Sequence, residues 1–574
     1  MFGWQGKILK IDLSTEKIQV IKPPLKIYKK FLGGRGLAGY FLKPFIQKPW
    51  FAEEMPLLFF TGPLGNTPSP TSGRMTIMSR SPLTDTVGDS SVGGSLGFQI
   101  KRAGWDGLIV TGRSPSLVGL QIYNEKVKIV KASSLRQATI KETLKKISLK
   151  GSSAVVGPAA ENGVLFANIV IDQEFFSGRN GLGLVMASKN LKFLTVEGNQ
   201  KTEIYDFKKV SEAKEQIFRL VAASPFLKGE LGLSEYGTGA LYDLMQQRKI
   251  LPTNNFKESS FEAANKMNAF QYKRRYSPRK YGCWGCHILC KKRSLAGESL
   301  PEYETMAHFS ALINNKSIAT VVKANALCND LGLDTISSAV TLATFAEINK
   351  ELLSSSRIFS LLKNIAYGKK EGELLKKGSY RYAVAKGEKE ASISVKKLEL
   401  PAYDPRGVYG MSLSLATSTR GGCHLRSYPI AHEILKKPIA TNRFSFLGKA
   451  KIIKSAEDLN AVVDSLVACK FIFFAATLEE YALLFSGVTG LKTTAQDLLK
   501  IGERIYYQER IMNFLNGFSK KDDDLPDRFF KQGNDKTIPL NRKFFLKARD
   551  EYYKIRGLDR LGRPFTKKQK ELGL

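Results

Sequence analysis

Long hydrophobic runs are missing from this chain of 574 residues. The longest apolar stretches, such as residues 57–60 and 471–477, fall far short of the roughly 18 residues that a membrane span needs. The N-terminal residues contain no apolar segment followed by a small-residue cleavage site, so no secretory signal is visible. We therefore expect a cytoplasmic protein without a membrane span.

Cysteine and histidine are scarce, with six and four residues respectively. Four of the cysteines fall in uneven clusters, which is typical of metal ligands in a reducing compartment rather than of a disulfide framework. Hydrophobic residues make up 43% and charged residues 25% of the chain, an ordinary globular balance. These values exclude a disordered, collagen-like or disulfide-stapled protein and predict two to four domains.

Acidic residues are too few to balance the basic ones, and the formal net charge is +35. The excess is spread along the whole chain, so there is no separate basic tail of the kind that binds nucleic acid. Two interpretations remain open. The charge either belongs to a solvated basic surface or attracts an acidic partner.

The pattern along the chain predicts an α+β protein. Two short apolar runs at residues 8–13 and 17–21 predict a β-hairpin, and short strand-like runs separated by glycine and proline follow between residues 32 and 113. A helical period begins at residue 206, and a lysine-rich zone at 368–398 is expected to be a loop or linker. We therefore predict a β-rich domain at 1–205 and two mostly helical domains at 206–398 and 399–574. The sequence shows no internal repeat.

Cys283, Cys286 and Cys290 form a C-x2-C-x3-C run. Three thiolates with this spacing can hold three irons of a [4Fe–4S] cluster, whose fourth iron needs a cysteine from elsewhere. The alternative is a zinc site completed by His287 or by a distant cysteine. Spacing alone does not choose the fourth ligand among the remaining cysteines, which are Cys328, Cys423 and Cys469.

Basic residues flank the cysteine run on both sides, and no acidic residue occurs between positions 272 and 297. Such a basic rim would attract an acidic electron carrier and make its docking sensitive to ionic strength. The alternative is a solvated loop whose charges repel one another. We favour docking.

Several strings along the whole chain, in the same order, resemble the tungsten-containing aldehyde:ferredoxin oxidoreductases. They are Met1-Phe2-Gly3-Trp4-Gln5-Gly6, Gly33-Gly34-Arg35-Gly36, Ser81-Pro82-Leu83-Thr84, Arg102-Ala103-Gly104-Trp105-Asp106, Asp330-Leu331-Gly332-Leu333-Asp334-Thr335 and the C-terminal end. The resemblance implies that the N-terminal β domain forms a base for two pterins and that two helical domains close over them. It also implies tungsten or molybdenum held by pterin sulfurs, magnesium at the pterin phosphates, and Cys469 as the fourth cluster ligand.

The resemblance also assigns the cofactor contacts. A cation at Arg74 suits pterin oxygens, Gly93 allows close backbone approach, and Asp334 and Asp464 accept hydrogen bonds from pterin nitrogens. Asp334 is also a candidate N-cap for a helix beginning at Thr335. The remaining contacts implied are Ser91, Ser177, Gly178, Arg179 and Asn329.

This chain departs from the family pattern at several of these positions. Asn329 replaces an aspartate, Ser91 replaces an asparagine, and Val467 replaces a glycine in the second aspartate segment. The loop at 174–179 is shorter and lacks one arginine. These departures bear on pterin affinity, whereas the cysteines are unchanged.

Glu304 and His424 align with the family's acid–base pair. Oxidation of an aldehyde to an acid requires attack on the carbonyl carbon by oxygen from water, and it releases two electrons and two protons. A buried glutamate can activate the water and a histidine can polarise the carbonyl oxygen. The alternative is that Glu304 pairs with His308 on one helix face. No interfacial iron site is expected.

We therefore hypothesise an aldehyde oxidoreductase that passes electrons through the cluster to an acidic ferredoxin. A homodimer of this chain is compatible with the hypothesis. Alternatives within the family are an aromatic acyl-CoA reductase subunit and a paralogue that kept the cluster but lost the pterin. A rival from another class is a basic nucleic-acid-binding protein with a zinc knuckle. The even charge spread and the lack of a known binding module argue against nucleic acid as a partner.

Overall fold

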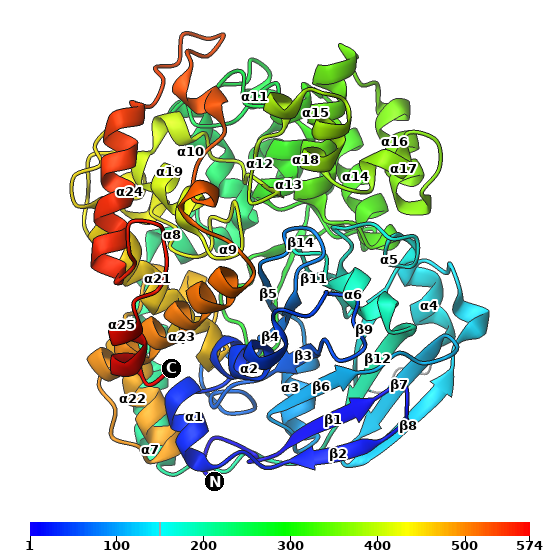
Figure 1. Ribbon diagram of the computed structural model, residues 1–574, viewed down its shortest axis with the longest axis vertical. Coiled ribbons are helices and arrows are strands. Elements are labelled where there is room, and N and C mark those ends of the chain that lie inside the picture. Colours follow the sequence, from blue (N-terminus) through cyan, green and yellow to red (C-terminus); the bar gives the residue numbers. More distant parts are fainter. Residues whose placement is uncertain (148–150) are drawn as a thin grey trace.

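Two six-stranded sheets lie within the first 200 residues. The computed structural model describes residues 1–147 and 151–574, and Figure 1 shows the sheets in blue and cyan in its lower part. The first sheet contains β1 (Ile8–Asp12), β2 (Ile18–Ile21), β3 (Leu57–Phe60), β4 (Met75–Arg80), β5 (Val87–Val92) and β6 (Gly107–Thr111). The second contains β7 (Val118–Tyr123), β8 (Lys126–Lys131), β9 (Ser152–Val156), β10 (Ile169–Ile171), β11 (Phe175–Ser177) and β12 (Leu191–Glu197).

The two sheets repeat one topology. Their strand orders are β2-β1-β6-β3-β4-β5 and β8-β7-β12-β9-β10-β11. Only the pairs β1–β6 and β7–β12 are parallel in these two sheets, and a helix precedes the last strand of each, α3 (Leu96–Arg102) or α6 (Leu182–Ser188). The sequence shows no internal repeat, so the repeat is one of topology alone, because strand pairing depends on buried patterns rather than on residue identity.

The equivalent edges of the two sheets meet. Strands β5 and β11 each form one edge of their sheet, and they lie in contact with each other. Central strands such as β3 and β6 are buried along their whole length, as expected for strands covered on both faces. The edge strand β2 is instead mostly exposed. The predicted hairpin is confirmed as β1 and β2.

Helices dominate from α7 (Phe207–Ala222) onward, as predicted from the change of period. Asp206 is the N-cap of α7, and its side chain accepts a hydrogen bond from Lys209 N at 3.0 Å. The helices that position the site are α13 (Tyr303–Phe309), α14 (Ile318–Leu331), α15 (Thr335–Asn349), α19 (Tyr409–Thr417), α21 (Lys449–Leu466), α22 (Leu478–Thr489), α23 (Ala495–Leu515) and α24 (Arg542–Arg556). The predicted fold class, a β-rich N-terminal domain followed by mostly helical domains, is confirmed.

The lysine-rich zone at 368–398 is not a simple linker, and this expectation was wrong. It contains α17 (Gly372–Leu375), α18 (Ser379–Ala385) and the short hairpin of β15 (Ser394–Val395) and β16 (Leu398–Glu399). Leu375, Ala383 and Ile393 are buried in the core. A few apolar positions among many lysines are enough to hold the segment, because long charged side chains lie along an apolar surface with their heads in water. No helix in the described part of the chain is long and apolar enough to cross a membrane.

Candidate active site and metal centre

One cavity of about 1080 Å³ lies where the sheets meet the helical region. Of the residues predicted to be functional, all except Ser177 line this cavity. They are Arg74, Ser91, Gly93, Gly178, Arg179, Cys283, Cys286, Cys290, Glu304, Asn329, Asp334, His424, Asp464 and Cys469. Segments far apart in the chain thus converge on a space large enough for an organic cofactor.

The two predicted cofactor segments lie on or directly after the two edge strands that meet, β5 and β11. Ser91 lies on β5 and Gly93 follows it, while Ser177 ends β11 and is followed by Gly178 and Arg179. The topological repeat therefore places two equivalent segments beside one cavity. A pair of similar ligands would suit such a pair of edges.

Arg74 links the first edge to the cysteines. Its guanidinium donates hydrogen bonds to the side chain and the carbonyl of Ser91. Burial opposes the charge of Arg74, but the attraction of Cys469 and Cys283 in their thiolate form raises its pKa. Arg74 is therefore a fixed cation between the sheet and the sulfur atoms.

The cysteine run is bound to the first sheet through backbone contacts. Trp284 N donates to Gly94 O at 3.3 Å, and Thr71 N donates to Gly285 O at 3.3 Å. A Cβ added to Gly93 would collide with the sulfur of Cys283. Gly93 thus permits a close approach, and the atom that approaches in the structure is the cysteine sulfur.

Cys469 is the cysteine outside the run that lines the same cavity. It lies at the N-cap of a short 3-10 helix, Lys470–Phe474. Cys328 is buried within α14 and Cys423 is buried in the loop before His424, and neither lines the cavity. Among the described residues no three His, Cys, Asp or Glu side chains are grouped tightly enough to hold a single metal ion.

Burial raises the pKa of two thiols in this group of cysteines. It raises the pKa of Cys286 to about 11, with Cys469 adding to the effect, and it also raises the pKa of Cys469. These groups are therefore neutral thiols until a cation compensates their charge, which is what iron or zinc does. Cys423 differs, because Arg420 and Arg426 lower its pKa although burial opposes this.

The two aspartate segments share one local conformation. Helix α14 ends at Gly332 with φ 79°, and α21 ends at Val467 with φ 60°. Asp334 follows the first of these turns and caps α15, accepting from Ser337 N at 2.8 Å, while its other oxygen accepts from Arg179 N at 3.0 Å. The predicted N-cap is confirmed, and Asp334 lines the cavity as well.

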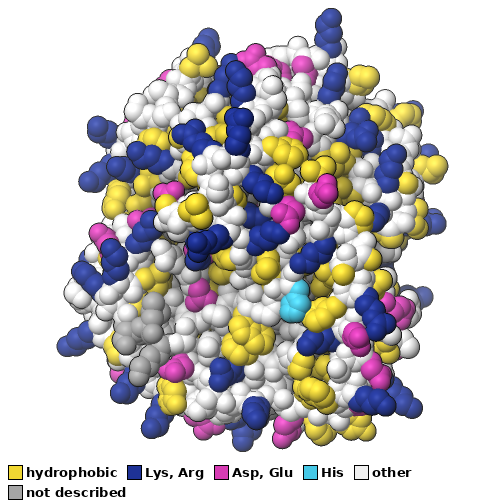
Figure 2. Space-filling view, turned by 180° about the vertical axis from the view of Figure 1, so that it is seen from behind, with side chains coloured by type: hydrophobic (Ala, Val, Ile, Leu, Met, Phe, Trp, Pro, Cys, Tyr) yellow, Lys and Arg dark blue, Asp and Glu magenta, His cyan; other side chains and the backbone are white. Residues whose placement is uncertain are grey.

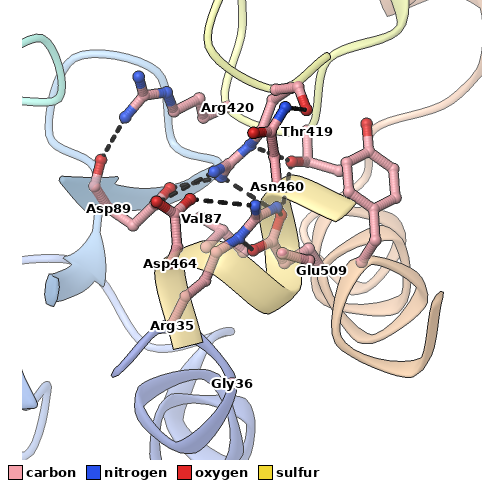
Figure 3. Close-up of polar contacts among 12 residues, drawn as sticks. Arg35, Gly36, Val87, Asp89, Thr419, Arg420, Asn460, Asp464 and Glu509 are labelled. Atoms are coloured by element: carbon pink, nitrogen blue, oxygen red, sulfur yellow. Dashed lines mark hydrogen bonds and ion pairs between the residues drawn. The ribbon is translucent and has the colours of Figure 1, made fainter. Parts of the chain in front are cut away.

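Asp464 belongs to a buried charge network that the sequence did not reveal (Figure 3). Arg35 binds Glu509 through two hydrogen bonds of 2.6 and 2.8 Å and approaches Asp464 at 3.5 Å. Arg426 binds Asp89 of β5 and lies 3.3 Å from Glu509. Burial would raise the pKa of Asp464, but Lys470 and Arg35 keep it below its ordinary value.

This network joins the sheet to the C-terminal helices and reaches the cavity wall. Thr419 donates to Glu509 at 2.6 Å and accepts from Arg426 at 3.0 Å. Asp89, Arg420 and Arg426 line the cavity. Pairs such as Asp89 and Arg426 are 337 residues apart, so no local spacing could have found them.

Glu304 and His424 both line the cavity and face each other there. Glu304 lies in the first turn of α13, where Oε2 accepts from Ala402 N at 2.9 Å and Oε1 lies 3.6 Å from His424 Nε2. Burial raises the pKa of Glu304 to about 7. Burial and the nearby Arg179 lower the pKa of His424 well below its ordinary value, so this histidine is neutral.

The alternative pairing of Glu304 with His308 is also present. His308 Nδ1 lies 2.6 Å from the Glu304 carbonyl oxygen and 3.5 Å from its carboxylate. Burial lowers the pKa of His308 to about 4, so this residue is a neutral neighbour. The carboxylate thus contacts both histidines, and only the contact with His424 joins two residues of the cavity lining.

Two tyrosines beside His424 carried no signal in the sequence. The rings of Tyr403 and Tyr428 lie 5.6 and 6.0 Å from the His424 ring, and their hydroxyls are 3.1 Å apart. Tyr428 has φ 49°, a costly conformation for a bulky residue. These rings make the wall near Glu304 aromatic.

The cavity wall fits a polar cofactor. Several buried polar atoms find no hydrogen-bond partner among the described residues, which is costly unless a ligand supplies one. They include Arg179 Nη1, Asn168 Oδ1, Glu304 Oε1 and His424 Nδ1, all on residues that line the cavity. Donors and acceptors together suit a pterin with its phosphate, and the cysteines at the same cavity suit a cluster.

This combination of sulfur ligands, a large polar cavity and an acid–base pair is typical of oxidoreductases with an organic metal cofactor. The model of the N-terminal domain of aldehyde ferredoxin oxidoreductase matches residues 8–198, and the model of its domains 2 and 3 matches residues 212–574. The chain therefore belongs to the aldehyde ferredoxin oxidoreductase family, and the resemblance seen in the sequence is confirmed.

Relatives match over the full length. The chain is 35% identical to the tungsten-containing aldehyde ferredoxin oxidoreductase of Thermococcus kodakarensis, covering 100% of this chain and 99% of the relative. It is 28% identical to the WOR-like subunit of an aliphatic sulfonate oxidoreductase of Pyrococcus furiosus, covering 100% and 97%. The fold is also similar to a chain in a solved structure, the active site complex BamBC of benzoyl coenzyme A reductase in complex with 1,5-dienoyl-CoA. The TM-score is 0.85 at 20% identity, and the match covers 100% of this chain and 97% of that chain. This last likeness shows the fold alone.

Proposed function

We propose that this protein oxidises an aldehyde to a carboxylic acid at a bis-pterin tungsten or molybdenum centre and passes the electrons through a [4Fe–4S] cluster to ferredoxin. The observation that carries the proposal is the placement of Glu304. Its free oxygen faces His424 in a cavity that four cysteines also line. The tungsten-containing relatives support the same activity.

The cofactors would be held by residues from both sheets and from both aspartate segments. Ser91 and Gly93 would hold one pterin, and Ser177, Gly178 and Arg179 the other. Asp334, Asp464 and Asn329 would accept or donate hydrogen bonds to the pterin rings, with magnesium at the phosphates. Cys283, Cys286, Cys290 and Cys469 would bind the cluster. When bound, the pterin–metal group supplies the two-electron redox chemistry.

The chain's own contribution is to move protons and orient the aldehyde. Glu304, with a pKa of about 7, is ionised often enough to take a proton from water beside the carbonyl carbon. Neutral His424 donates a hydrogen bond to the carbonyl oxygen, because its lowered pKa keeps it uncharged. The aldehyde gains one oxygen from water and loses two electrons, and the two protons leave by way of these groups.

We also propose the domain limits given by the sequence, namely 1–205, 206–398 and 399–574. The large shared cavity lies where these three parts meet, since Arg74, Glu304 and His424 come from different parts. Closure of two helical domains over a β-rich base would separate the reacting aldehyde and its water from bulk solvent.

The test is a survey of substrates on anaerobically purified protein with a viologen dye as electron acceptor. Aldehyde-dependent dye reduction, with one carboxylic acid formed for every two dye molecules reduced, is the expected result. Oxidation of reduced viologen by aromatic acyl-CoA thioesters, without any aldehyde oxidation, would overturn the proposal. So would zinc in place of iron in the purified protein.

A further inference from the structure

The cysteine run reaches the protein surface at its centre. Trp284, Gly285 and His287 are exposed, and Trp284 is 36% exposed. A Cβ added to Gly285, which has φ 65°, would meet no atom within 4 Å. The cluster ligand Cys286 therefore lies directly beneath a small, open segment of surface.

An aromatic stack stands on each side of this segment, and each carries a cation. On one side Phe98 stacks on Trp284 with ring centroids 3.7 Å apart, and Arg102 lies 5.3 Å over Phe98. On the other side Phe218 stacks on His287 at 4.2 Å, and Lys214 lies 5.4 Å over Phe218. The attraction between cation and ring thus places one positive charge beside each stack.

Four of the eight basic residues in the rim predicted from the sequence are paired with carboxylates. Ion pairs with acids distant in the chain join Lys273 and Lys280 to Glu235, Lys291 to Glu302, and Arg293 to Glu174. Arg102 and Lys214, like Arg274, Arg275 and Arg279 of the rim, have no carboxylate within ion-pair distance among the described residues. Charge without an ion-pair partner beside the cysteine run thus comes from α3 and α7 as well as from the segments that flank the run.

The overall charge does not mark a docking surface by itself. Basic side chains are spread widely over the face that Figure 2 shows, with fewer carboxylates between them. Net charge of +35 attracts any acidic molecule at long range, but an electron needs a defined point of closest approach. The surface over Cys286 provides one, flanked by charges that would orient the partner.

We propose that Trp284, Gly285 and His287, with Arg102, Lys214 and Lys228 around them, form the docking surface for a small acidic electron-carrier protein. Lys228 belongs to the surface because its side chain donates to the carbonyl of His287. The proposal rests on the function proposed above and adds the place where electrons leave. Each docking event oxidises the cluster and reduces the carrier by one electron, so one aldehyde requires two events.

The test compares two charge reversals in the holoenzyme. The variant R102E/K214E reverses the charge of both cations beside the aromatic stacks. The control K128E/K131E reverses two exposed lysines on the edge strand β8. Aldehyde oxidation is measured with purified ferredoxin and, separately, with a viologen dye, at low and at high salt. We expect kcat/KM for ferredoxin to fall about tenfold or more at low salt in R102E/K214E, because rim charges control the association rate. The control should change less than about twofold.

The dye separates the possible failures. Dye reduction and the visible absorbance of the cluster should be unchanged in both double variants, which shows that the fold and the site are intact. A loss of ferredoxin activity no larger than in the control would overturn the docking surface while leaving the proposed function standing. Absence of dye reduction in the unaltered protein would instead contradict the proposed function. If R102E/K214E loses its cluster, the milder R102Q/K214Q gives the same comparison.

Discussion

The two oxygens of Glu304 have different surroundings. One accepts a backbone hydrogen bond from Ala402, and the other faces His424 without a hydrogen-bond partner among the described residues. Burial makes ionisation of this group costly and raises its pKa to about 7. A carboxyl group in this state exchanges protons near neutral pH, as a general base must.

The activity should therefore rise with pH around neutrality. Since only the ionised form of Glu304 can accept a proton, kcat/KM for the aldehyde increases as the pH passes upward through about 7 and is lost below it. The measurement is the pH profile of dye-linked oxidation. A profile that is flat between pH 5.5 and 8.5 would contradict the role of this residue.

Replacing Glu304 with glutamine should cost about 10²–10⁴-fold in kcat, the usual contribution of a general base. Glutamine keeps the shape and can still accept the hydrogen bond from Ala402, so the fold should not change. The matched control E351Q alters a carboxylate at a surface ion pair with Arg357 and should keep nearly full activity. Equal activity of E304Q and E351Q would remove Glu304 from the mechanism.

Cys469 should be required for the cluster, whereas Cys328 should not. The C469S variant is expected to lose most of the iron and the brown absorbance, because serine is a poor iron ligand. The control C328S replaces a buried cysteine within α14 that does not line the cavity, and its iron content should match that of the unaltered protein. Iron content is measured on anaerobically purified samples of each.

At the scale of elements, Val467 ends α21 in a conformation that favours glycine. A left-handed conformation costs a β-branched residue about 1–2 kcal/mol. Burial of the Val467 side chain, which is 1% exposed, stabilises the folded state by about 1.5–3 kcal/mol. The family pattern has glycine at this position. The chain tolerates valine because these two terms nearly balance.

The variant V467G should therefore destabilise the protein by only about 1 kcal/mol. The control V463G lies one turn earlier in α21 and is fully buried. It should cost about 2.5–4 kcal/mol, since it loses the same burial, relieves no strain and adds a glycine to a helix interior. The denaturant midpoints of the two variants provide the comparison. A lower midpoint for V467G than for V463G would disprove the balance.

Local elements were predictable where the signal is local. The hairpin of β1 and β2 and the start of α7 at Asp206 follow from short-range patterns, and both are confirmed. The repeated topology was not predictable, because sheets of the same strand order need not share residues. The prediction of a loop or linker at 368–398 was wrong, because its few apolar residues form helices and a hairpin only by packing against the core.

The candidate site divides in the same way. The cysteine run is visible because its ligands are adjacent, and Cys469, Glu304 and His424 were reached only through family resemblance. The network of Arg35, Asp89 and Glu509 was missed, because the partners are hundreds of residues apart and each is an ordinary residue type alone. Ion pairs across such distances are set by packing, which a single sequence does not display.

At the scale of the whole molecule, one cavity joins the β-rich part to the helical parts. Its lining comes from β5, from α13 to α15 and from α21 with the segment after it. A cofactor bound there contacts every part and stabilises the folded state by mass action. Binding at a thousand times the dissociation constant corresponds to about 4 kcal/mol.

Protein produced without tungsten or molybdenum should therefore be less stable than the loaded protein. We expect a lower apparent melting temperature and faster proteolysis in the helical region, where contacts through the cofactor are missing. The comparison uses the same chain purified from cells grown with and without the metals. Identical melting and proteolysis of the two samples would show that the cavity contributes nothing to the coupling of the parts.

Metal analysis of the anaerobically purified protein, together with its visible spectrum, tests the central claim most directly. The account predicts about four irons with one tungsten or molybdenum per chain, and a brown colour that bleaches on reduction by an aldehyde. Stoichiometric zinc in a colourless protein, without iron or the heavier metal, would contradict it.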